Sequence, residues 1–171
     1  MAKPKLALYW AASCGGCEIA VLDIQEKILD VASAFDIVFW PVALDFKRAD
    51  VEALADGELA AAFLNGAIRT SEQQEMVELL RRKAAAVVAF GSCATSGGVP
   101  GLANLFEREA ILDTVYREAP SVDNGAGTMP AQESQVPEGT LKLPAFPVVN
   151  EAELALVMAG AWVVTGLILT L

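Results

Sequence analysis

Three cysteines are the residues of this sequence best suited to chemistry, and they are its only cysteines. Cys14 and Cys17 form a Cys-Gly-Gly-Cys turn after one apolar run, and Cys93 follows another apolar run. In an open α/β sheet, such strand-to-loop steps form the edge at which ligands bind. Thiolates at these loops favour iron–sulfur chemistry over simple packing, although a 4Fe–4S cluster takes four thiolates and this chain has three cysteines.

The Cys14–Cys17 pair alone leaves three interpretations open: a pair of metal ligands, a redox dithiol and an inert pair. The two glycines between them let the backbone turn tightly, so that both sulfurs can reach one centre. The segment from Trp10 to Cys17, between a predicted strand and a predicted helix, also resembles the active-site loop of a thioredoxin-like disulfide oxidoreductase.

Cys93 favours the metal interpretation, because a redox dithiol does not need a third cysteine at the end of another strand. A lone cysteine is often a small buried apolar residue. Here, however, glycines at 91, 97, 98 and 101 would let a bulky group approach closely. Zinc is disfavoured because the sequence has no histidine, so a fourth ligand would be a carboxylate or water.

Two further segments near the predicted loops have ordinary explanations. Glu18 follows the second thiolate and would complement the helix dipole as an acid in the first turn. The segment 65–71, Asn-Gly-Ala-Ile-Arg-Thr-Ser, is explained by a turn followed by a helix cap.

Four short apolar runs predict buried strands: residues 6–10, 36–40, 59–64 and 86–90. Strands that alternate with helical stretches predict an α/β fold, in which a flavodoxin-like parallel sheet carries helices on both faces. Residues 1–119 are expected to form this domain. Residues 120–150, rich in proline and glycine, are expected to be an irregular C-terminal excursion of it.

Helical elements are predicted between these strands. Apolar residues recur at helical spacing over 19–31, and Ser71 is a suitable N-cap for a polar helix over 72–83. Residues 97–101 are predicted to form a loop, after which Asn104 is expected to cap a helix that runs to Arg117.

Composition limits the possible partners. The chain has 171 residues, of which 54% are hydrophobic, and this indicates a globular domain. Its net charge of −10 argues against nucleic acid or anionic membranes as partners. The short basic N-terminus does not resemble a signal peptide, so a cytoplasmic location is expected.

Residues 151–171 form an apolar C-terminal tail, which carries no charge from Leu154 onward. It is compatible with a membrane span, with a buried element that completes the sheet, or with a truncated or altered ending. The acidic residues before it and the absence of flanking lysine or arginine argue against a membrane as a partner.

Taken together, three segments resemble the small subunit of nickel–iron hydrogenases, in the superfamily that includes the 20 kDa subunit of NADH:quinone oxidoreductase. They are residues 14–18, residues 64–70 and residues 91–104. The likeness covers roughly residues 3–146 and is greatest for the methyl-viologen-reducing (F420-non-reducing) type. The complex I subunit usually has adjacent cysteines in its first motif, so the Cys-x-x-Cys-Glu form favours a hydrogenase.

This resemblance implies an electron-transfer subunit of a cytoplasmic hydrogenase, with Cys14, Cys17 and Cys93 as ligands of a proximal 4Fe–4S cluster and Glu18 as a proton-transfer residue. The nickel–iron centre would belong to the large subunit, so the isolated chain would not split hydrogen. Further iron–sulfur or flavin subunits, such as heterodisulfide reductase, would be partners. In the family, a Pro-Gly-Cys-Pro motif soon after the segment that matches 143–146 supplies the fourth ligand. This sequence does not contain the motif. A non-catalytic scaffold without a complete cluster is therefore a further alternative.

Overall fold

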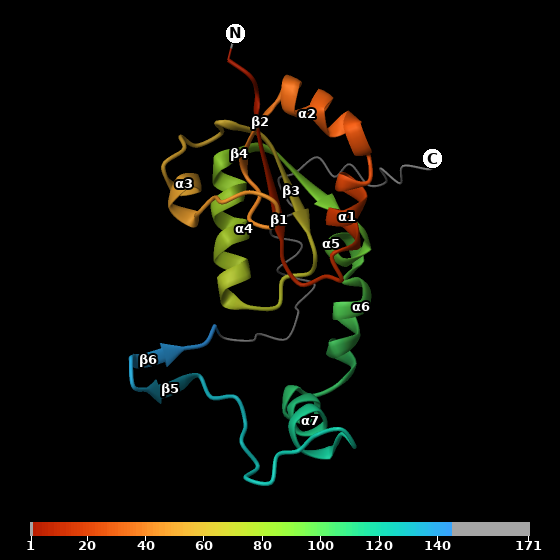
Figure 1. The fold of residues 1–171 in the computed structure, drawn as a ribbon, viewed down its shortest axis with the longest axis vertical. Coiled ribbons are helices and arrows are strands. Elements are labelled where there is room, and N and C mark those ends of the chain that lie inside the picture. The colour runs from red at the N-terminus through yellow and green to blue at the C-terminus, as the bar shows by residue number, and fades with distance from the viewer. Residues whose placement is uncertain (1, 145–171) are drawn as a thin grey trace.

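A four-stranded parallel sheet forms the centre of the protein (Figure 1). The computed structural model describes residues 2–144. The strands of this sheet are β1 (Lys5–Trp10), β2 (Asp36–Phe39), β3 (Leu59–Asn65) and β4 (Ala84–Phe90). They lie in the order β2-β1-β3-β4, as in the flavodoxin-like arrangement, which changes direction between β1 and β3. All four predicted strands and the predicted fold class are confirmed.

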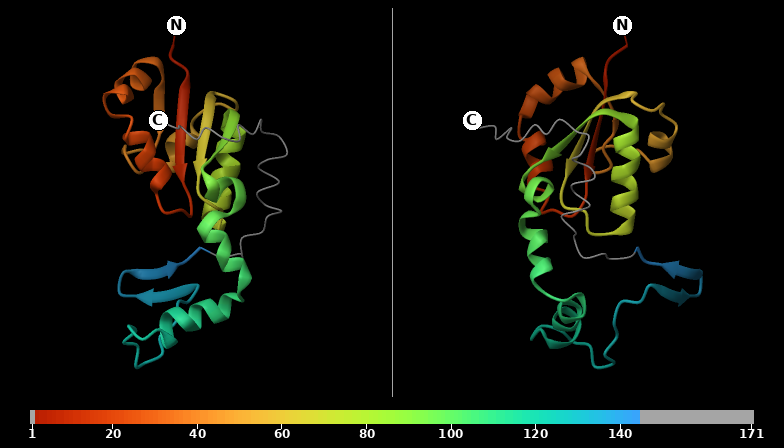
Figure 2. Two further views of the ribbon diagram at one scale, coloured as in Figure 1. Left: turned by 90° about the vertical axis from the view of Figure 1, so that its right-hand side faces the viewer. Right: turned by 180° about the vertical axis from the view of Figure 1, so that it is seen from behind.

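Helices cover both faces of the sheet. The helices α1 (Gly16–Leu22) and α2 (Ile28–Ala34) lie on one face, and α4 (Ser71–Lys83) lies on the other (Figure 2). The short helix α3 (Arg48–Glu52) packs beside α4. Because the central strands are covered on both sides, they are continuous apolar runs rather than alternating ones. Their core includes five residues that are at most 2% exposed: Ala7, Leu59, Ala62, Leu80 and Val87.

The helical stretch predicted over 19–31 is interrupted. α1 ends at Leu22, a turn of 3-10 helix η1 (Gln25–Lys27) follows, and α2 then begins. Gln25 has a φ of 57°, in the left-handed region that does not continue an α-helix. Ile19 and Leu22 are 58% and 49% exposed, so their apolar side chains remain available on the surface.

The N-cap of α4 is Thr70, and the prediction of Ser71 was wrong by one residue. The backbone N–H of Gln73 donates to Thr70 Oγ1 at 3.2 Å, and the Gln73 side chain accepts from the Thr70 backbone N–H at 3.3 Å. This reciprocal pair is a capping box, which satisfies two donors at the start of the helix.

Short helices follow β4, where a loop was predicted over 97–101. They are α5 (Ser92–Ser96), α6 (Gly98–Gly101), the 3-10 helix η2 (Leu102–Leu105), α7 (Arg108–Asp113) and the π-helix η3 (Thr114–Glu118). The prediction that Asn104 caps this helix was also wrong, because α7 begins at Arg108 with Glu107 at the N-cap position. This segment leads away from the carboxyl edge of the sheet (Figure 1).

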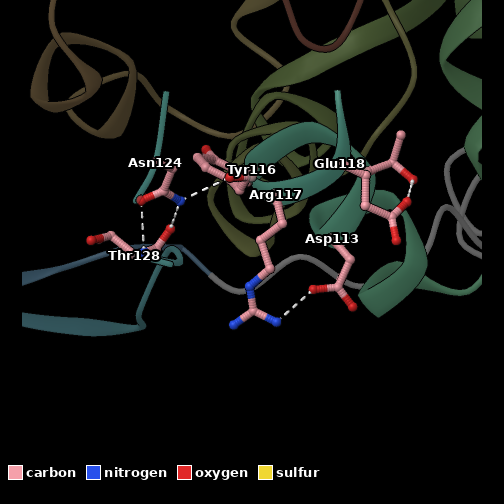
Figure 3. Close-up of polar contacts among 7 residues, drawn as sticks. Asp113, Tyr116, Arg117, Glu118, Asn124 and Thr128 are labelled. Atoms are coloured by element: carbon pink, nitrogen blue, oxygen red, sulfur yellow. Dashed lines mark hydrogen bonds and ion pairs between the residues drawn. The ribbon is translucent and has the colours of Figure 1, made fainter. Parts of the chain in front are cut away.

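The expected irregular excursion contains a β-hairpin of β5 (Glu133–Val136) and β6 (Gly139–Lys142). Before it, Asn124 closes a turn. Its side-chain amide donates to the carbonyl oxygens of Tyr116 and Thr128, both at 2.8 Å, and its Oδ1 accepts from the Thr128 N–H at 2.9 Å (Figure 3). Arg117 pairs with Asp113 one helical turn away, at 2.9 Å.

No helix within residues 2–144 is both long and apolar enough to cross a membrane. The interpretations of the apolar tail over 151–171 lie outside the described residues, as do those of residues 145–150. The division of the chain at residues 119 and 150 stays a prediction.

Candidate metal centre

Loops from neighbouring strands meet at the carboxyl edge of the sheet. The loop after β1 and the loop after β3 are joined by a bridge between Ala12 and Ala67, with two backbone hydrogen bonds of 2.9 Å. Gly66 makes this approach possible, since its φ is 106° and a Cβ there would lie 2.8 Å from the Ala11 carbonyl carbon. Cys93 lies in the first turn of α5, and the segment that leads from β4 into this helix begins next to β3 because β3 and β4 are paired as far as Asn65 and Phe90.

Each cysteine sulfur lies against a glycine. The Gly16 N–H donates to Cys14 Sγ at 3.5 Å. A Cβ on Gly91 would lie 2.3 Å from Cys17 Sγ, and a Cβ on Gly98 would lie 2.8 Å from Cys93 Sγ. Gly91 stands two residues before Cys93, at the N-cap of α5. The contact between Gly91 and Cys17 therefore brings the Cys17 sulfur to the start of the helix that carries the third cysteine.

The electrostatics of Cys17 also connect the three cysteines. Burial is the main cause that raises the pKa of the Cys17 thiol above its ordinary value. Negative charge at Cys93 and Cys14 raises this pKa further, and charge at Glu18 adds a smaller effect. Cys14 is exposed, the other two are half-buried, and all three are free thiols. A raised pKa is the opposite of what activates a nucleophilic redox cysteine, which the thioredoxin-like alternative would require at this pair.

Glu18 is not a solvated helix-start acid, because it is only 3% exposed. The indole N–H of Trp40 donates to Glu18 Oε2 at 2.5 Å, and the Asn65 side-chain amide donates to Oε1 at 3.4 Å. Trp40 directly follows β2 and Asn65 ends β3, so the donors come from the two strands that flank β1. Sequence analysis had assigned these residues only to a strand end and a turn.

Gly15 and Trp10 complete the first cysteine loop. Gly15 has a φ of 82°, and a Cβ there would lie 2.8 Å from the Trp10 ring. A side chain at this position would therefore be both strained and blocked. The pair of glycines at 15 and 16 predicts a close approach of the backbone to another group. The spacing of the residues does not predict that this group is the Trp10 ring.

Arg69 lines a cavity of about 500 Å³. Residues of η2, α7 and the segment 130–132 also line this cavity, whereas none of the three cysteines does. The interpretation of residues 65–71 as a turn followed by a helix cap agrees with the capping box at Thr70, and Arg69 adds a cation to this cavity.

The donor set fits an iron–sulfur cluster in part. Within residues 2–144, no three side chains of the types Cys, Asp and Glu converge on a point that could hold a single metal ion. Thiolates of a cluster bind different iron atoms and therefore do not converge on one point. Three free thiols against glycine backbone offer such ligands, whereas a fourth cysteine is not present in the sequence.

The fold and this edge define a flavodoxin-like α/β protein whose cysteine loops meet where such folds bind ligands. The chain belongs to the family described as NADH ubiquinone oxidoreductase, 20 Kd subunit, which matches residues 14–153. The resemblance found in the sequence is thereby confirmed at the level of the family.

Two curated relatives are hydrogenase subunits. The chain is 38% identical to the iron-sulfur subunit of the F420-non-reducing hydrogenase of Archaeoglobus profundus, over 83% of this chain and 44% of that protein. It is 26% identical to the delta subunit of the NAD-reducing hydrogenase HoxS of Cupriavidus necator, over 82% of this chain and 64% of that protein. The chain thus spans less than half of the first relative.

Solved structures support the same fold. A chain of an NAD⁺-reducing [NiFe]-hydrogenase in the H₂-reduced state matches with a TM-score of 0.66 and 28% identity, over 86% of this chain and 76% of that chain. A chain of the [NiFeSe]-hydrogenase of Dm. baculatum matches with a TM-score of 0.51 and 18% identity, over 73% of this chain and 49% of that chain. The second likeness concerns the fold alone.

Proposed function

We propose that this chain is the iron–sulfur electron-transfer subunit of a cytoplasmic nickel–iron hydrogenase, with Cys14, Cys17 and Cys93 as ligands of a proximal 4Fe–4S cluster. The observation that carries the proposal is the contact between the Cys17 sulfur and Gly91, in the loop that leads to Cys93. The family assignment and the hydrogenase relatives agree with it.

The chain's own residues would prepare this site in three ways. The glycines beside each sulfur keep Cβ atoms away from the group. The Ala12–Ala67 bridge fixes the loop that carries Cys14 and leads into α1, where Cys17 lies. A cluster held there would accept and pass on single electrons.

Glu18 would take part in proton transfer from the large subunit, as the resemblance implies. Its carboxylate is buried next to Cys17 and is held by Trp40 and Asn65, so its position is well defined. A defined position is what general acid–base chemistry requires of a proton-carrying group.

The partner in this proposal is a nickel–iron large subunit, and further iron–sulfur or flavin subunits such as heterodisulfide reductase would receive the electrons. Exposed apolar side chains support a protein partner near the cysteine loops. Val99, Leu105 and Phe106 are 76%, 74% and 63% exposed, on the segment that follows Cys93. Grouped exposed apolar residues of this kind mark interaction sites.

Anaerobic reconstitution with iron and sulfide, followed by electron paramagnetic resonance, tests the cluster. Wild-type protein should give an iron–sulfur signal, and Cys14→Ser and Cys93→Ser should both reduce the iron content. Ser134→Ala, in the exposed hairpin, is the control and should retain wild-type iron. If Cys93→Ser binds as much iron as wild type while Cys14→Ser binds none, the two cysteines do not share a centre.

A further inference from the structure

We propose that the cavity of about 500 Å³ beside Arg69 is a binding site for an organic monocarboxylate: the Arg69 guanidinium binds the carboxylate, and the apolar walls hold the body of the ligand. Residues of η2, α7 and η3 and of the segments 130–132 and 143–144 line this cavity together with Arg69. The proposal goes beyond the proposed function and does not depend on whether the cysteines hold a cluster.

The first argument is the size and composition of the cavity. Small-molecule sites are typically cavities of about 300–1,000 Å³ with mainly apolar walls and a few polar groups. This cavity lies within that range, and most of its described lining residues are apolar, among them Phe106, Ile111, Leu112 and Leu143. A ligand with an apolar body would be removed from water against these side chains, which favours binding.

The second argument is the charge of the cavity. Within the described structure, its charged lining residues are Arg69, Arg108 and Glu109. Arg108 donates to Glu109 Oε1 from Nη2 at 2.6 Å and from Nε at 3.2 Å, so these two side chains neutralise each other. The hydrogen bonding of Arg108 also lowers the pKa of Glu109, whose carboxylate is therefore ionised at neutral pH. One positive charge, that of Arg69, is left uncompensated among these residues.

The third argument is that Arg69 is available to a ligand. Among the ion pairs of residues 2–144, none includes Arg69. Its backbone N–H donates to the Gln73 side chain at 2.8 Å, so its backbone is fixed at the start of α4. The planar guanidinium matches the two oxygens of a carboxylate. A monoanion would neutralise the single uncompensated charge, whereas a phosphate dianion would add negative charge to a chain whose net charge is −10.

The fourth argument is the form of the helix in the cavity wall. Tyr116 lines the cavity from the π-helix η3, in which the Ala119 N–H donates to the Thr114 carbonyl oxygen at 2.9 Å, five residues back. Turns of π-helix are rare and often lie at functional sites. The Asn124 amide donates to the Tyr116 carbonyl oxygen at 2.8 Å, which holds the backbone of Tyr116 in place (Figure 3).

Nuclear magnetic resonance titration of the full-length chain with 4-phenylbutyrate tests the site, and 4-phenylbutanamide is the uncharged probe of similar shape. The acid should shift the resonances of Tyr116 and bind about tenfold more tightly than the amide, because only the acid forms charge-assisted hydrogen bonds with Arg69. Arg69→Gln should remove this preference: it should weaken binding of the acid about tenfold and leave binding of the amide unchanged.

Arg117→Gln is the matched control, because Arg117 is an exposed arginine that pairs with Asp113 and does not line the cavity. It should bind both probes as wild type does. Phe106→Ala tests the apolar wall at a residue that is 63% exposed, so the fold should tolerate the change, and both probes should bind more weakly. Equal binding of the acid and the amide would overturn the proposal, as would an unchanged preference in Arg69→Gln or the absence of any shift with either probe at millimolar concentration.

Discussion

Gly91→Ala would place a single methyl group between the loop after β4 and the sulfur of Cys17. The ideal Cβ lies 2.3 Å from Sγ, whereas nonbonded heavy atoms prefer about 3.5–4.0 Å, so the methyl group arrives more than ~1 Å too close. Overpacking of this kind costs about 1–3 kcal/mol. Gly91 also has φ 85° and ψ 167°, a region used almost only by glycine, which adds about 1–3 kcal/mol for alanine.

The two effects together predict a loss of roughly 2–6 kcal/mol in the free energy of unfolding, a large part of the stability of a typical domain. Urea unfolding of the reduced apo chain measures it as a lower midpoint. Iron uptake should fall in parallel, because Cys17 must move away from Cys93.

Gly125→Ala is the control for Gly91→Ala. Gly125 has no neighbour within 4 Å of its ideal Cβ and no positive φ, so its stability should change by less than about 0.5 kcal/mol. If Gly91→Ala unfolds at the wild-type midpoint and takes up the same iron, the packing of Cys17 on this loop is wrong.

Three further predictions concern groups around the site. Thr70→Ala should destabilise the chain by about 1 kcal/mol in urea unfolding because it removes the cap of α4, while Thr70→Ser should retain most of that stability. Burial raises the pKa of Tyr9 to about 12, above its ordinary value of 10.0. The contribution of the Tyr9 phenol to the free energy of unfolding is therefore complete below pH 10 and is lost as the pH rises toward 12. That loss amounts to about 2–3 kcal/mol and should be absent in Tyr9→Phe when unfolding is measured across this range. Because the pKa of Cys17 is raised, iodoacetamide should alkylate it at higher pH than an ordinary free thiol. Glu18→Gln should shift this pH profile part of the way to lower pH. An unchanged profile would show that Glu18 does not act on this thiol.

Local sequence information was sufficient for the strands. Each contains a continuous apolar run, and Pro41, Gly66 and Gly91 mark where three of these runs stop. Burial on both faces of the sheet makes such runs distinctive. The helix boundaries were harder to predict from the sequence. The interruption near Gln25 leaves the apolar spacing nearly intact, and Thr70 and Ser71 are both good capping residues, so only the backbone geometry distinguishes them.

The candidate site was predictable to the extent that residue type reveals chemistry. Cysteines at strand ends and an adjacent glutamate indicated the centre before its geometry was known. Trp40 was missed because its contact with Glu18 joins helix α1 to the residue after β2, over a separation of 22 residues, and no spacing rule describes such a contact. The glycines near the cysteines could be recognised in the sequence as positions of close approach. Which sulfur each glycine contacts depends on the three-dimensional arrangement of the loops.

The order of strands in the sheet also sets the order in which the ligands come together during folding. β4 pairs with β3 and not with β1, so Cys93 reaches the site only after β3 has taken its place beside β1. Before that step, an iron donor would meet the Cys14–Cys17 pair alone, on a loop not yet held by the Ala12–Ala67 bridge. Under the proposed function, stable loading of a cluster would therefore depend on completion of the sheet, and nascent chains that end before Cys93 would have no third thiolate with which to retain it.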